Sequence, residues 1–153
     1  MIYRLIVERK LRHAFAALNR GDYAPILGSF AATAEHTFYG EHALGGSRHT
    51  PAAIRAWYAR LRKMLPDLHF ELDSVSVRGY PWRTTAMVAW RDRFRLPDGC
   101  VRSNQGVHVL QLRWGKVVSL RIHTDTQKLA EVARELLAQH VMEAGLAPIT
   151  DAP

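Results

Sequence analysis

The stretch between Leu68 and Thr124 constrains the fold most, because it contains four segments of strand type joined by short turns. Turn residues stand between the segments, at Gly79 and Pro81, at Pro97-Asp98-Gly99 and at Trp114-Gly115. The expected strands cover residues 70–77, 84–94, 101–112 and 117–124. Connections this short join neighbouring strands in opposite directions, so the sequence predicts an antiparallel meander.

Helical patterns flank this meander. Apolar residues at three- to four-residue spacing from Ile2 to Leu18 indicate an amphipathic helix that ends before Gly21. Thr50-Pro51 is a typical helix start, because threonine caps free amides and proline suits the first turn. Helices are therefore expected over residues 2–19, 24–30, 51–65 and 127–143, with a further strand over 33–39. Helices that cover one face of an antiparallel sheet make an α+β fold.

Composition limits the class of protein. With 153 residues the chain has the size of one domain, expected over residues 1–144 with an irregular tail over 145–153. The single Cys100 excludes an internal disulfide, and no zinc-ligand spacing surrounds it. No apolar run reaches the roughly 20 residues of a membrane span, so a cytoplasmic location is expected. The net charge of +7 is dispersed without a basic tract, which argues against nucleic acid as a partner.

Strand parity assigns side chains to the two faces of the sheet. His108 shares a face with Leu110 and Leu112, and Asp92 shares a face with Val88, Trp90 and Phe94. A three-residue loop over 113–115 would place Leu110 opposite Val118 and His108 opposite Leu120, whereas a two-residue loop would reverse the parity and place Leu120 and Ile122 on the polar face. This register predicts one apolar inner face that carries a histidine and a carboxylate.

Four segments resemble ketosteroid isomerase, in the same order along the chain. They are AALNRGD at residues 16–22, ATAEH at 32–36, AAIRAWYA at 52–59 and GKVVSLR at 115–121. More broadly, residues 5–130 resemble the SnoaL-like polyketide cyclases of the nuclear transport factor 2-like superfamily. The resemblance implies a cone-shaped α+β barrel, in which three N-terminal helices and a C-terminal helix cover a strongly curved antiparallel sheet around a pocket. It also implies a homodimer formed through the outer face of the sheet.

The resemblance also indicates which chemistry to expect. The general-base aspartate of the isomerase falls on His36, the protonated aspartic acid of its oxyanion hole on His108, and its tyrosine on Ala14. Because alanine donates no hydrogen bond to an enolate, steroid isomerisation by that mechanism is not expected. Ile122 stands where the limonene-epoxide-hydrolase relatives carry a catalytic aspartate, which argues against their chemistry too.

The candidate catalytic residues are His36, His108, Asp92 and Asp125. Histidine moves protons readily at neutral pH, and Asp92 is an inward carboxylate that needs either a partner or a function. Asp125 corresponds in place to an acid/base aspartate of the polyketide cyclases, and as Asp-Thr before a helix it is equally a helix N-cap. The expected pocket wall consists of Phe15, Phe38, His42, Trp57, Tyr58, Leu61, Val88, Trp90, Leu110, Leu120 and Ile122.

Two functions follow from these residues. One is a cofactor-independent isomerase, cyclase, lyase or hydrolase that acts on a small apolar, cyclic molecule, with no metal. The other is a non-catalytic domain of the same fold that binds a small ligand or a protein. Buried histidines and helical aromatic residues also serve as ordinary core residues. The loop around His42 is expected to border the pocket mouth. Its glycines would permit a lid to move, and they are equally what an ordinary turn requires.

Overall fold

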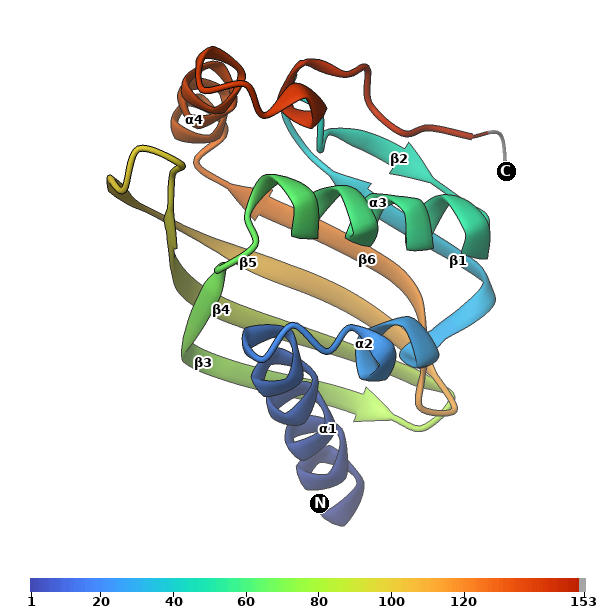
Figure 1. Ribbon diagram of the computed structural model, residues 1–153. Coiled ribbons are helices and arrows are strands. Elements are labelled where there is room, and N and C mark those ends of the chain that lie inside the picture. Colours follow the sequence, from blue (N-terminus) through green and yellow to red (C-terminus); the bar gives the residue numbers. More distant parts are fainter. Residues whose placement is uncertain (152–153) are drawn as a thin grey trace.

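A curved sheet of six strands forms one layer of the molecule, and helices pack against its concave face (Figure 1). The computed structural model describes residues 1–151. The spatial order of the strands is β2-β1-β6-β5-β4-β3. Their bounds are β1 (Phe30–Phe38), β2 (Gly46–Arg48), β3 (His69–Tyr80), β4 (Arg83–Arg95), β5 (Val101–Arg113) and β6 (Lys116–Thr124).

The predicted meander is confirmed, since β3, β4, β5 and β6 pair antiparallel in sequence order. β1 pairs with β6 in parallel, and β2 adds an antiparallel strand at the edge beyond it. β2 was not predicted, because its three residues are too few to display an alternating pattern. The predicted α+β fold is therefore present, with one parallel pair inside the sheet.

The helices are α1 (Ile2–Asn19), α2 (Ala24–Ser29), α3 (Pro51–Met64) and α4 (Thr126–Ala138). The Thr50 hydroxyl caps α3 by accepting a hydrogen bond from the Ala53 amide at 3.2 Å. α4 ends five residues earlier than predicted, because His140 adopts a left-handed backbone with φ 66°. The amide of Val141 then bonds back to Leu136, which is the pattern of a Schellman motif. A short 3-10 helix, η1 (Met142–Gly145), follows.

The predicted register of the β5–β6 hairpin is wrong. The loop has two residues, Trp114 and Gly115, both with positive φ, and Arg113 pairs with Lys116. An irregularity after Gln111 then shifts the register, so that Leu110 faces Leu120 and His108 faces Ile122. The extra residue is Val118 of β6, which has no partner in β5. It restores the parity that a two-residue turn alone would have reversed, so Leu120 and Ile122 stay on the apolar inner face.

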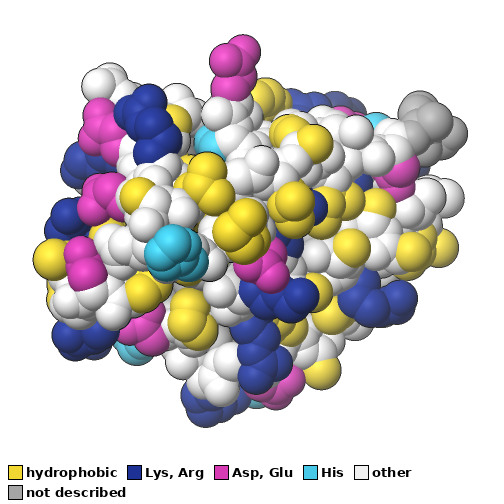
Figure 2. Space-filling view, turned by 45° about the horizontal axis from the view of Figure 1, so that its top comes forward, with side chains coloured by type: hydrophobic (Ala, Val, Ile, Leu, Met, Phe, Trp, Pro, Cys, Tyr) yellow, Lys and Arg dark blue, Asp and Glu magenta, His cyan; other side chains and the backbone are white. Residues whose placement is uncertain are grey.

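The segment after η1 packs against β2 and the start of α3. Arg48 donates a hydrogen bond from Nε to the Ile149 carbonyl at 3.0 Å, and the Asp151 carboxylate accepts one from the Thr50 amide at 3.0 Å. Residues 152–153 of the expected tail lie outside the described residues. Among residues 1–151, no helix is both long enough and apolar enough to cross a membrane. Figure 2 shows basic and acidic side chains interspersed on the face in view.

Candidate active site

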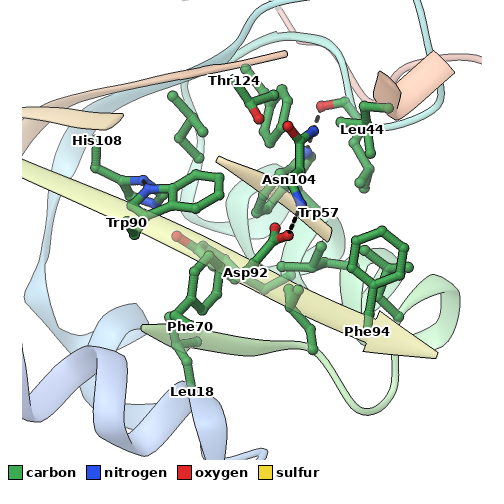
Figure 3. Close-up of a pocket in the computed structure, with 17 residues that line it drawn as sticks. Leu18, Leu44, Trp57, Phe70, Trp90, Asp92, Phe94, Asn104, His108 and Thr124 are labelled. Atoms are coloured by element: carbon green, nitrogen blue, oxygen red, sulfur yellow. Dashed lines mark hydrogen bonds between the residues drawn. The ribbon is translucent and has the colours of Figure 1, made fainter. Parts of the chain in front are cut away.

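A small cavity of about 40 Å³ lies between the concave face of the sheet and the helices α1, α3 and α4 (Figure 3). Asp92, His108 and Tyr58 are its titratable wall residues, and Asn104 is a further polar residue of the wall. Burial raises the pKa of the Tyr58 phenol, so that it stays neutral. Several predicted wall residues do line it, namely Phe38, Trp57, Tyr58, Leu61, Trp90 and Ile122. Others are not in the wall, namely Phe15, His42, Val88, Leu110 and Leu120. Most of these are buried in the surrounding core, whereas His42 packs at the loop against Phe38 with ring centroids 5.2 Å apart.

Asp92 lies at the edge of this cavity, on the inner face of β4. Its Oδ1 atom accepts a hydrogen bond from the Asn104 amide of β5 at 2.7 Å (Figure 3). Burial raises the pKa of Asp92 from 3.8 to about 6, and the hydrogen bond from Asn104 offsets part of that effect. Asp92 also lines a polar groove of about 250 Å³ beside the cavity. The carboxylate is thus ionised at neutral pH and positioned between the cavity and the exterior.

His108 is held in one tautomer by a neighbouring indole. The Trp90 Nε1–H group donates to His108 Nδ1 at 2.7 Å, so the ring proton resides on Nε2. Burial lowers the pKa of His108 to about 3, and the ring is therefore neutral at ordinary pH. Phe15 packs edge-on against it, with ring centroids 5.1 Å apart. His108 is consequently a neutral hydrogen-bond donor in the wall of the cavity.

His36 is outside the cavity wall, so the predicted chamber with two histidines is not formed. Its side chain is fully buried beneath α3, with its ring 4.4 Å from the Trp57 ring. Arg48 donates a hydrogen bond to His36 Nδ1 at 2.8 Å, which places the ring proton on Nε2. Burial, followed by the charge of Arg48, lowers the pKa of His36 well below 6.5. This histidine belongs to the core beside Arg48 and has no contact with the cavity.

Arg48 is the residue that sequence reasoning missed. Its side chain is fully buried, and its guanidinium donates to the carbonyls of Gly45, Gly46 and Ile149 at 2.8, 2.6 and 3.0 Å. It also lies over the Trp57 ring, 5.5 Å from the centroid. Burial lowers the pKa of Arg48 to about 10. A single arginine between Ser47 and His49 looks like a surface residue, and no pattern in the sequence identifies it as buried.

Asp125 is a helix cap in the structure. Its carboxylate accepts a hydrogen bond from the Lys128 amide at 3.1 Å at the start of α4, and it is not in the cavity wall. Its carbonyl accepts a hydrogen bond from the Asn104 side chain at 3.1 Å. Asp125 therefore positions Asn104, which in turn contacts Asp92.

Removal of this cap gives a first testable prediction. Asp125→Ala is expected to lower the free energy of unfolding by about 1 kcal/mol, because the first turn of α4 loses its acceptor. Urea unfolding followed by circular dichroism measures this difference. Asp125→Ser is the matched control, since serine also caps helices and should retain most of the stability. Equal losses in the two variants would contradict the capping role.

Metal binding has no cluster of ligands to support it. Within residues 1–151, no three His, Cys, Asp or Glu side chains are grouped so as to hold a metal ion.

Comparison with known proteins identifies the family. Residues 11–120 match the model of the SnoaL-like domain. No match is found among the curated proteins. The fold is similar to that of a nuclear transport factor 2-like protein of unknown function from Burkholderia pseudomallei, with a TM-score of 0.73, 20% identity, and coverage of 82% of this chain and 95% of that one.

Two further structures have the same fold. TerC, crystallised with polyporic acid, gives a TM-score of 0.68 at 18% identity over 82% of this chain and 96% of that one. A protein assigned as a polyketide cyclase from Xanthomonas campestris gives 0.60 at 19% identity over 84% and 98%. The match to the family model spans most of the chain and the fold agrees with it, so this protein belongs to the SnoaL-like domain family.

Proposed function

We propose that this protein is a cofactor-independent enzyme that transfers a proton within a small, flat, conjugated substrate. Asp92 accepts the proton from one carbon, the His108 Nε2–H group donates a hydrogen bond to the substrate oxygen on which negative charge develops, and protonated Asp92 then returns the proton to a second carbon of the conjugated anion. The observation that carries the proposal is the contrast between these two groups. One cavity wall holds a carboxylate with a pKa of about 6 and a neutral imidazole with a pKa of about 3.

The spacing of the two groups supports a conjugated substrate. Asp92 faces Asn104 and His108 faces Val88, so they are four residues apart along the β4–β5 pair, with Trp90 between them on the same face. Four residues of strand correspond to roughly 13 Å between Cα atoms. A substrate that contacts both groups must lie along the Trp90 ring. Charge formed beside Asp92 reaches an oxygen at His108 only through a conjugated system.

The assignments of related structures agree with this substrate class. The fold neighbours include the protein assigned as a polyketide cyclase and TerC, which was crystallised with polyporic acid. These likenesses are below 25% identity and support the fold; the choice of substrate class rests on Asp92, His108 and the aromatic wall.

The size of the cavity favours a second candidate function. A volume of about 40 Å³ has room for a few water molecules, whereas ligand sites commonly measure roughly 300–1,000 Å³. An enzyme of this kind must therefore widen its cavity when the substrate enters. A cavity that does not widen would favour the non-catalytic domain that binds a protein. A crystal soaked with a conjugated ketone distinguishes the two, because the ketone occupies the cavity only if it widens.

The rate of proton abstraction as a function of pH tests the proposal. With anthrone, a flat tricyclic ketone, as the probe in D₂O, we expect enzyme-dependent deuterium incorporation at its methylene carbon, which is conjugated to the carbonyl oxygen across the central ring, measured by NMR. The rate should rise with pH and level off above about 6, because Asp92 must be ionised to accept a proton. His108 stays neutral over this range, so the profile of rate against pH should show no second change in slope from its titration. Exchange no faster than in buffer, for anthrone and for other ketones whose acidic carbon is conjugated to a distant carbonyl oxygen, would contradict the proposal.

A further inference from the structure

A second and larger hollow opens between α1, α2 and the turn that joins β5 to β6. It measures about 510 Å³ and shares no wall residue with the cavity at Asp92 and His108. We call it the basic groove. Figure 1 shows that α1 and α2 lie over the end of the sheet at which β5 turns into β6. Its floor is apolar and consists of buried side chains, among them Val7, Leu11, Leu110, Leu112 and Val117.

The rim of the basic groove is positively charged. Arg9 and Lys10 of α1 and Lys116 of β6 line it, and the wall contains no aspartate or glutamate. Within residues 1–151, none of these three cations forms an ion pair; the acidic Glu8 on the same helix pairs with Arg12 at 2.8 Å. Two of the four lysines of the chain are therefore in this rim without a carboxylate partner.

The two lysine ammonium groups flank the same turn. Lys116 Nζ donates a hydrogen bond to the Gly28 carbonyl of α2 at 2.7 Å, which joins the two sides of the groove. Lys10 Nζ comes within 3.9 Å of the position that a Cβ atom on Gly115 would occupy. Positive charge is thus concentrated at one end of an apolar hollow.

We propose that the basic groove binds an amphiphilic carboxylate, with the carboxylate at Lys10 and Lys116 and an apolar body on the floor. The volume is in the range of small-molecule sites, roughly 300–1,000 Å³. A concave apolar wall with unpaired cations on its rim attracts a ligand that has one anionic end. This site is separate from the proposed active site, so either can fail without the other.

Calorimetric titration with a matched pair of ligands tests this proposal. Octanoate should bind in a 1:1 ratio at least about tenfold more tightly than 1-octanol, which has the same chain without the charge. Octyl phosphate separates a requirement for a carboxylate from a requirement for any anion. We expect octyl phosphate to bind no more tightly than octanoate, and markedly tighter binding would contradict the carboxylate assignment.

Charge variants locate the site. Lys10→Gln/Lys116→Gln should weaken octanoate binding about tenfold and leave octanol binding unchanged. Lys63→Gln/Lys128→Gln is the matched control, because it removes the same charge through the other two lysines. Equal loss in both double variants would show a general charge effect and overturn the proposal.

A steric variant provides an independent measurement. Gly28 lines the groove, and nothing lies within 4 Å of the position of its missing Cβ atom. Gly28→Phe should therefore fold normally and weaken the binding of both octanoate and octanol. Unchanged binding of both ligands, or no saturable octanoate binding to the wild type, would overturn the proposal. The proposal would also be overturned if the wild type bound phosphatidylglycerol vesicles but not octanoate, and if the double lysine variant lost the binding to vesicles.

Discussion

Asp92→Asn is expected to reduce proton abstraction from the proposed substrates by roughly 10²- to 10⁴-fold. Asparagine has nearly the same shape, and its carbonyl oxygen can still accept the hydrogen bond that the Asn104 amide donates at 2.7 Å. What disappears is the only carboxylate that residues 1–151 place in the cavity wall. The His108 pKa of about 3 and the raised pKa of Tyr58 leave no group in the described part of the wall that titrates between about pH 5 and 8, so the residual enzyme-dependent rate should not change over that range.

The matched control is Asp22→Asn. Asp22 is exposed and accepts a hydrogen bond from the Ala24 amide at 3.1 Å, so this variant makes the same chemical change away from the cavity. The rate should equal that of the wild type. Wild-type turnover in Asp92→Asn would remove Asp92 from the mechanism.

Stability measurements on Asp92→Asn show whether its lost activity reflects lost structure. The folded protein holds the pKa of Asp92 at about 6, above the ordinary 3.8, so folding favours the protonated form. The stability that this group contributes is present below about pH 4 and is lost as the pH rises through 6. Asp92→Asn should therefore be at least as stable as the wild type at pH 7, and the difference should vanish below pH 4. Urea unfolding at the two pH values measures this.

The fold could be predicted further than the site. The meander, the amphipathic helices and the Thr50 cap follow from local patterns of period two and three to four. The inner face of β5 was predicted correctly although its register was not. Register depends on the length of one turn and on one irregularity beside Leu112. Gly115 marks where the turn lies but does not fix its length, and the irregularity has no distinctive sequence signature.

The site required tertiary information. Strand parity brought Asp92 and His108 to the inner face, and the structure places both in the cavity wall. Parity does not reveal what covers a side chain, so it could not separate His36, buried beneath Trp57, from His108, which faces the cavity. The Trp90 indole that fixes the tautomer of His108 is two residues from Asp92 in sequence, yet only the pairing of β4 with β5 shows that it contacts the imidazole.

Arg48→Met is expected to lower the free energy of unfolding by roughly 3–5 kcal/mol. Methionine fills a similar volume but donates no hydrogen bond. The carbonyls of Gly45, Gly46 and Ile149 and the Nδ1 atom of His36 would then lose their donor. Each unsatisfied buried acceptor costs about 1–3 kcal/mol.

Two effects oppose each other at Arg48, and their sizes decide the sign. Burial of the guanidinium is itself unfavourable, because it lowers the pKa of Arg48 to about 10, well below the usual range of arginine. Removing the charge relieves that cost once, whereas four acceptors lose a partner, so the net effect is destabilising. Arg55→Met, on the exposed face of α3, is the control and should change stability by less than about 0.5 kcal/mol.

A double variant tests whether His36 and Arg48 act as a unit in the core. His36→Phe removes the ring nitrogens, including the buried Nε2 that has no partner within residues 1–151. Each single variant leaves one partner of the His36–Arg48 hydrogen bond unsatisfied, whereas the double variant removes both partners. The double variant should therefore be less destabilised than the sum of the single variants by at least about 0.5 kcal/mol. Strict additivity of the unfolding free energies would show that the 2.8 Å contact contributes nothing to stability. It would leave the three carbonyls as the whole reason for a buried arginine.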